Sequence, residues 1–118
     1  MPIVYRVTGP NETQLALRRG LRPQPIPRAT KFATGVRRGI HFFTTLDEAR
    51  EVAQSISEDV PSTTFTVITL DLPTLATSVP DLNWNIPPED PVTAMVYPQS
   101  VPAEDIQIVT SYKDGEEI

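Results

Sequence analysis

Proline is the residue that most constrains the fold of this chain. Thirteen of its 118 residues are proline, about twice the ordinary usage, and they concentrate in residues 23–27 and 73–91. Proline lacks a backbone N–H and clashes with the preceding helical turn, so it interrupts helices and central strands. The sequence therefore predicts a mixed fold with many loops instead of a helical bundle.

Short apolar runs between the proline-rich segments predict the regular elements. Alternation of apolar and polar residues indicates strands at residues 3–8, 39–43, 63–72, 92–97 and 106–112. Two helices are expected, one capped by Asn11 and ended by Gly20, the other capped by Thr45. Because the helices come early and the later half is mostly strands, the expected class is α+β.

The size of the chain predicts one domain over residues 1–118, with an acidic tail at 113–118 that is expected to fray. The absence of cysteine excludes a disulfide scaffold and a thiol nucleophile, and a single histidine disfavours a metal site. No apolar run is long enough to span a membrane, and the N-terminus is unlike a secretory signal. We therefore expect a soluble, cytoplasmic protein with no membrane partner and no metal.

Charge is distributed unevenly along the chain. Residues 18–38 carry seven basic and no acidic residues, so this segment has a charge of +7. The other three basic and fifteen acidic residues sum to −12, which gives the net charge of −5. Such a segment predicts a surface that binds an anion or an acidic partner, or else a solvated loop balanced by acidic neighbours. The basic residues are Arg18, Arg19, Arg22, Arg28, Lys31, Arg37 and Arg38.

Residues 21–38 also carry three prolines and no sustained periodicity, so they are expected to form a surface loop. Common catalytic signatures are absent, including the glycine-rich dinucleotide motif, the P-loop, the nucleophile elbow and HExxH. A Ser-His-Asp triad would have to use His41, which lies inside an apolar strand, so a triad is not expected.

Four short motifs follow one another in an informative order. They are YRVT at residues 5–8, RGLRP at 19–23, GIHFFTT at 39–45 and TAMVYPQSVPAEDI at 93–106. This order resembles the ADP-ribosyltransferase fold, especially its small toxin-like members and the thymidine ADP-ribosyltransferases that modify DNA. The resemblance implies a split β-sheet with two short helices and proline-rich loops, whose cleft holds NAD⁺.

The resemblance also implies roles for four residues. Arg6 would contact the nicotinamide ribose or phosphate, and a guanidinium suits such oxygens; Thr8 would lie beside it on the same face. His41 takes the place of the tyrosine that forms one side of the nicotinamide sandwich, and Thr44 belongs to a threonine-rich element. Two other interpretations stay open: Arg6 as a surface ion pair and His41 as a core residue bonded to a backbone carbonyl.

One departure from the family pattern bears on activity. Most active members carry a glutamate on the late strand, whereas residues 92–97 contain no carboxylate. Loss of such a charge costs orders of magnitude in rate. The resemblance therefore implies a degenerate domain, a pseudoenzyme that binds NAD or a related nucleotide with weak or no transferase activity.

Two alternatives belong to other classes of function. One is a small phage or mobile-element protein that inhibits a host protein through its basic segment 18–38. The other is an active ADP-ribosyltransferase with a relocated acid, Glu89 or Glu104, whose basic segment contacts nucleic acid. Nucleic-acid binding as the sole function is less favoured, because the net charge is negative and Phe32 is the one aromatic residue in the basic segment.

Overall fold

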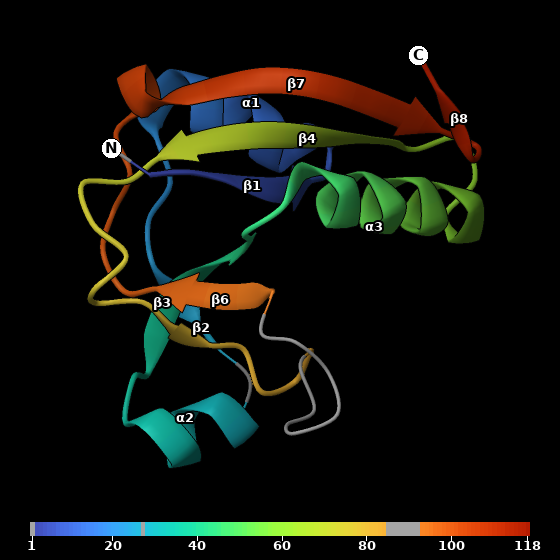
Figure 1. Cartoon of the computed structure of the whole chain (residues 1–118). Coiled ribbons are helices and arrows are strands. Elements are labelled where there is room, and N and C mark those ends of the chain that lie inside the picture. Colours follow the sequence, from blue (N-terminus) through green and yellow to red (C-terminus); the bar gives the residue numbers. More distant parts are fainter. Residues whose placement is uncertain (1, 27, 85–92) are drawn as a thin grey trace.

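An eight-stranded antiparallel sheet runs through the residues that the computed structural model describes, namely 2–26, 28–84 and 93–118 (Figure 1). Its main path runs β5-β6-β3-β1-β4-β7-β8, and β2 pairs with β3. The strands are β1 (Ile3–Thr8), β2 (Gln24–Pro25), β3 (Arg38–Phe43), β4 (Thr64–Asp71), β5 (Val79–Pro80), β6 (Ala94–Tyr97), β7 (Ile106–Lys113) and β8 (Glu116–Glu117). The helices are α1 (Pro10–Arg19), α2 (Arg28–Thr34), α3 (Leu46–Asp59) and the 3₁₀ turn η1 (Ala103–Asp105). The α+β class is thus confirmed.

Local sequence explains where the two longer helices begin and end. The Thr45 hydroxyl accepts from the Glu48 N–H at 3.4 Å, so the expected cap of α3 is confirmed. Helix α1 begins two residues earlier than expected: Gly9 is its N-cap and Pro10 occupies the first turn, so the prediction of Asn11 as the cap was wrong. Gly20 ends α1, as expected, with a φ of 80°.

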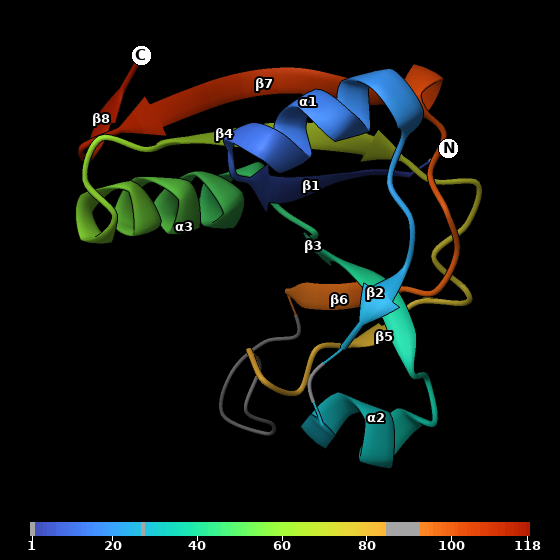
Figure 2. The ribbon, with the colours of Figure 1, turned by 180° about the vertical axis from the view of Figure 1, so that it is seen from behind.

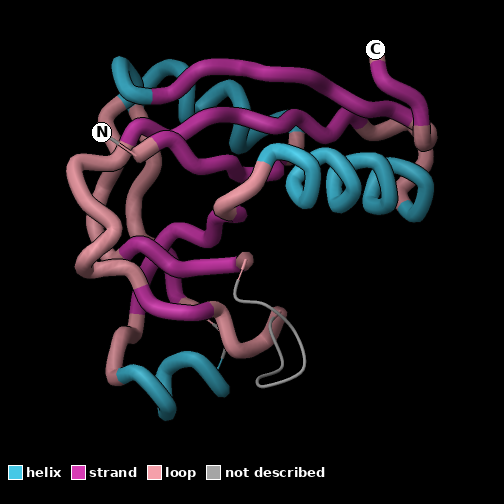
Figure 3. The backbone as a smooth tube through the Cα atoms, in the orientation of Figure 1, coloured by secondary structure: helices cyan, strands magenta, loops and turns pink. Residues whose placement is uncertain are grey.

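Three further expectations need correction. Residues 21–38 are not one irregular loop, because they contain β2 and α2, so the described chain has three α-helices where two were expected (Figure 3). Strand β5 lies within the second proline-rich segment. The C-terminal tail does not fray but folds back as β8, pairing Glu117 with Tyr112.

Helices α1 and α3 cover opposite faces of the sheet. The core under α1 includes Ala16 together with Val4 of β1 and Ile68 of β4, whereas the core under α3 includes Ala53 and Val67. Successive residues of a strand point to opposite faces, so even-numbered residues of β1 and β4 face α1 and odd-numbered residues face α3. Helix α1 lies behind these strands in Figure 1 and in front of them in Figure 2, which shows the opposite side.

Strand β7 changes face at a β-bulge. Ile68 pairs with Ile108 and Val67 with Thr110, so Val109 is an extra residue. As a result, Ile106 packs in the core under α1 and Tyr112 packs in the core under α3.

The sheet is split between β1 and β3. Strand β1 pairs with β4 along its whole length but with β3 only at Tyr5 and Phe43. Beyond this pair the strands part, and β3 continues into a lower half with β2, β5 and β6 (Figure 2). At this point the two parts of the eight-stranded sheet are joined through one residue pair.

A backbone bridge lies beside the split. Leu21 and Val101 exchange two hydrogen bonds of 2.8 and 2.9 Å. Gly20 is required for this approach, because a Cβ there would lie 2.3 Å from the Val101 carbonyl oxygen. Within the three described ranges, no helix has the length and apolar character needed to cross a membrane.

Candidate functional site

A pocket of about 550 Å³ opens on the α1 side of the split. We call it the cation pocket, after the arginine side chains in its lining. It is lined by Arg6, by Glu12, Leu15 and Arg19 of α1, by residues 20–22 and 24, and by residues 39–41 of β3. Its lining includes three arginines, Arg6, Arg19 and Arg22, and one acidic residue, Glu12. Its volume is in the range of small-molecule sites, and its charge favours an anion.

A second pocket, of about 250 Å³, opens on the α3 side. We call it the aromatic pocket; it is lined by Arg6, Val7, His41, Phe42, Phe43, Val52, Ile56, Asp81, Trp84 and Ala94. Trp84 meets Phe43 edge to face, with ring centroids 5.3 Å apart, and its Nε1–H donates to Glu48 at 2.9 Å. Arg6 and His41 line both pockets, so these two residues lie between the two cavities.

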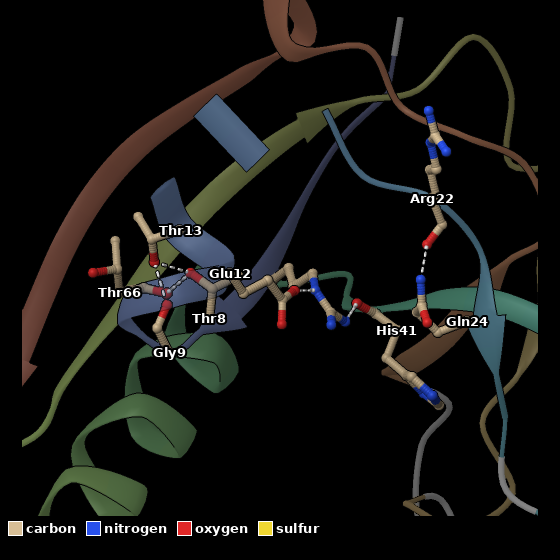
Figure 4. A network of polar contacts seen from close by, with 9 residues as sticks. Thr8, Gly9, Glu12, Thr13, Arg22, Gln24, His41 and Thr66 are labelled. Atoms are coloured by element: carbon tan, nitrogen blue, oxygen red, sulfur yellow. Dashed lines mark hydrogen bonds and ion pairs between the residues drawn. The ribbon is translucent and has the colours of Figure 1, made fainter. Parts of the chain in front are cut away.

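Arg6 bridges the two halves of the sheet. Its Nε donates to Glu12 at 2.5 Å, and its Nη1 donates to the His41 carbonyl oxygen at 2.8 Å (Figure 4). The side chain is 19% exposed, so it is more sheltered than an ordinary surface ion pair. The structure thus places the guanidinium at the mouth of both pockets, held by one carboxylate and one carbonyl.

His41 is held by a buried carboxylate. Its Nδ1 lies 2.7 Å from Oδ2 of Asp81, a residue that is only 7% exposed. The Asn83 N–H donates to the other oxygen of Asp81 at 3.1 Å. The imidazole is therefore oriented by a carboxylate and not by the backbone carbonyl considered from sequence.

Thr8 and Thr44 do not line either pocket. Thr8 is 1% exposed, and its hydroxyl is 2.6 Å from that of Thr13 and 3.3 Å from the Thr66 carbonyl oxygen (Figure 4). Thr44 donates its N–H to the Thr93 carbonyl oxygen just past the end of β3. Of the four residues assigned to cofactor binding, the structure brings together Arg6 and His41 only.

The seven basic residues of the segment 18–38 separate into two groups. Arg19 and Arg22 line the cation pocket beside Arg6. The other five do not line either pocket: Arg18 lies in the last turn of α1, Arg28 and Lys31 lie on α2, Arg37 precedes β3 and Arg38 begins it. The α2 half of the segment is therefore a separate basic surface.

No carboxylate lies on β6, whose sequence is AMVY. Of the proposed relocated acids, Glu104 is exposed on η1 and does not line either pocket, and Glu89 lies outside the described residues. Among the described residues, no group of three potential metal-binding side chains is found.

Sequence analysis missed Glu12, Asp81 and Trp84 as site residues. Glu12 carried a partial signal, because it lies in the first turn of a helix that directly follows the strand of Arg6. The sequence offered no signal for Asp81 or Trp84, because each forms its hydrogen bond with a residue at least 36 positions away along the chain.

Comparisons with protein-family models, curated proteins and solved structures yield no match to this chain. A functional conclusion must therefore be drawn from the two pockets and the residues between them.

Proposed function

We propose that this chain is a degenerate ADP-ribosyltransferase-like domain that binds NAD⁺, ADP-ribose or a related nucleotide, with weak or no transferase activity. The cation pocket would hold the phosphates, and the aromatic pocket would hold a ring. The observation that carries the proposal is the presence of Arg6, Arg19 and Arg22 in the lining of one pocket. Arginine offers planar, bidentate donors that match phosphate oxygens.

The split in the sheet supports the same assignment. The two pockets open on opposite faces and share Arg6 and His41. In this proposal an extended ligand contacts Arg6 and His41 with its charged centre and places its flat end in the aromatic pocket. A single compact anion would use the cation pocket alone.

Weak turnover follows from the carboxylates at the site. Glu12 is engaged by Arg6 and Asp81 by His41, and β6 supplies none. Among the described residues, each carboxylate that lines a pocket is already paired, so none of them is free to stabilise an oxocarbenium-like centre at the split.

The test is isothermal titration with NAD⁺ and ADP-ribose, with the same samples assayed for nicotinamide release. Each charge-assisted hydrogen bond contributes about 1.5–3 kcal/mol, so Arg19→Gln with Arg22→Gln should weaken binding at least about tenfold. The matched control is Arg18→Gln with Arg37→Gln, which removes the same charge from exposed residues outside both pockets.

The outcomes separate the candidates. Tenfold loss in the pocket variant alone, without nicotinamide release, supports a binding domain. Equal losses in both variants mean that nucleotide attraction is a general charge effect, and the pocket assignment fails. Failure to bind either nucleotide would leave the alternative role, capture of an acidic host protein by the basic segment, as the better hypothesis.

A further inference from the structure

The aromatic pocket has the shape and lining of a site for a flat ring. Phe43 and the indole of Trp84 form one wall, and Val52 and Ile56 of α3 form part of the rest. Trp84 is 48% exposed, yet its contacts with Phe43 and Glu48 hold it in position. Exposed aromatic side chains with fixed orientations supply contact area for planar ligands at low entropic cost.

The polar group of this pocket is the imidazole of His41. His41 and Phe43 are two residues apart in β3, so their side chains project from the same face of the sheet. Its Nδ1 is bound to Asp81, and 35% of the side chain remains exposed. Within the described ranges, Nε2 has no hydrogen-bond partner, which leaves it available to a ligand.

Asp81 determines which hydrogen-bonding role Nε2 can take. A carboxylate only accepts, so Nδ1 must carry the proton that it shares with Asp81. In the neutral imidazole Nε2 then holds a lone pair and is an acceptor. The buried position of Asp81 and the N–H of Asn83 keep the carboxylate in this orientation.

We infer that the aromatic pocket selects a planar heteroaromatic ring that carries an N–H donor, an amide or an exocyclic amine, and that His41 Nε2 accepts from it. This inference rests on the proposed nucleotide-binding function and specifies its ring site. A ring whose corresponding group can only accept would leave two lone pairs opposed in a sheltered pocket, which a polar site rejects strongly.

Three dinucleotides test the inference: NAD⁺, its nicotinic-acid analogue and its hypoxanthine analogue. The second replaces the carboxamide by a carboxylate, and the third replaces the adenine amine by a carbonyl. Fluorescence of Trp84, the single tryptophan, reports occupancy of the pocket. At mildly alkaline pH, one of the two analogues should bind at least about tenfold more weakly than NAD⁺, which also identifies the ring that enters.

The variant Asp81→Asn reverses the hydrogen-bonding role. The N–H of Asn83 retains the amide oxygen, so the amide nitrogen donates to Nδ1 and Nε2 becomes the protonated atom. Asp81→Asn should therefore bind more tightly the analogue that the natural protein binds weakly. The control Asp105→Asn, outside both pockets, should leave the preference unchanged.

Nitrogen-15 NMR of the single histidine checks the natural protein without any substitution. It should show protonated Nδ1 and a lone pair on Nε2, with Nε2 shifted by NAD⁺. Equal affinity for all three dinucleotides would overturn the inference and leave the proposed function standing. A proton on Nε2 in the free, neutral protein would also overturn it. Failure of all three dinucleotides and of ADP-ribose to bind would remove the proposed function as well.

Discussion

Arg6 donates a hydrogen bond of 2.8 Å to the carbonyl oxygen of His41, across the point where β1 and β3 part. These two residues are also the ones that line both the cation pocket and the aromatic pocket. A ligand that enters both pockets passes this bond. The guanidinium is thus placed both to join the two halves of the sheet and to meet a ligand between them.

Glu12 competes with a ligand for Arg6, because its carboxylate already accepts from Nε. Glu12→Gln keeps the size of the side chain and removes the negative charge from the cation pocket. We expect ADP-ribose to bind about 3–10-fold more tightly at low salt, with a smaller gain at high salt because charges are screened. Titration at two ionic strengths measures this. Weaker binding by the variant would mean that Glu12 positions Arg6 for the ligand.

Thr8 has a structural role in this fold, since its buried hydroxyl is bonded to Thr13 and to the Thr66 carbonyl oxygen. Thr8→Val preserves the shape and removes these hydrogen bonds, so we expect a loss of about 1–2 kcal/mol in the free energy of unfolding. Nucleotide affinity, measured by the same titration, should stay within about twofold. A tenfold loss of affinity in a folded variant would restore Thr8 to the binding site.

Gly20 controls the bridge beside the split. Gly20→Ala places a Cβ against the Val101 carbonyl oxygen and forces a side chain into a conformation with a φ of 80°. We expect the free energy of unfolding to fall by at least about 3 kcal/mol. Gly35 is the matched control, because its φ is 76° but nothing lies within 4 Å of the added Cβ; Gly35→Ala should cost about 1–2 kcal/mol. Urea denaturation compares them, and equal losses would show that the close approach contributes nothing.

Glu117 links stability to pH. The Tyr112 hydroxyl and the Arg50 guanidinium, 3.0 and 2.7 Å away, lower the pKa of this carboxyl, although partial burial opposes them. A carboxyl with a lowered pKa stabilises the fold above its ordinary pKa, and this stabilisation is lost as pH falls through the lowered value. Glu117→Gln should therefore be less stable than the natural protein near neutrality, and the two should converge in acid.

Thermal unfolding across this pH range measures the difference between the two proteins. Glu116→Gln is the control, because Glu116 lies beside Glu117 on β8 and its side chain forms no hydrogen bond or ion pair among the described residues. A difference from the natural protein that is constant with pH would contradict the assignment to Glu117.

Local sequence was sufficient for the elements whose pattern agrees with their environment. The alternation in β1 and the cap at Thr45 predicted their elements, and both were confirmed. Helix α2 was missed because three prolines precede it, although Gly35, with a φ of 76°, is a typical helix-ending residue. The cap of α1 was misplaced because Asn11 was interpreted as the cap, whereas Pro10 is already the first helical residue, a position that proline favours.

The candidate site depended on long-range pairing, which a single sequence does not display. His41 was singled out from its motif, but its carboxylate partner, Asp81, comes beside it only because β5 pairs with β6 and β6 with β3. Likewise, Arg19 and Arg22 were grouped with five other cations by sequence proximity. The bridge between Leu21 and Val101 is what sets those two at the pocket.

The bulge at Val109 determines how β7 can change in length. Before it, even-numbered residues face α1, where Ile106 packs; after it, they face α3, where Tyr112 packs and its hydroxyl meets Arg50. One strand thereby contributes to both hydrophobic cores. Deleting Val109 would leave a regular ladder in which Ile108 still lies opposite Ile68 and Thr110 opposite Val67, so Tyr112 would stay in the core under α3. The bulge is therefore the position at which β7 can lose one residue without exchanging the faces of the residues around it.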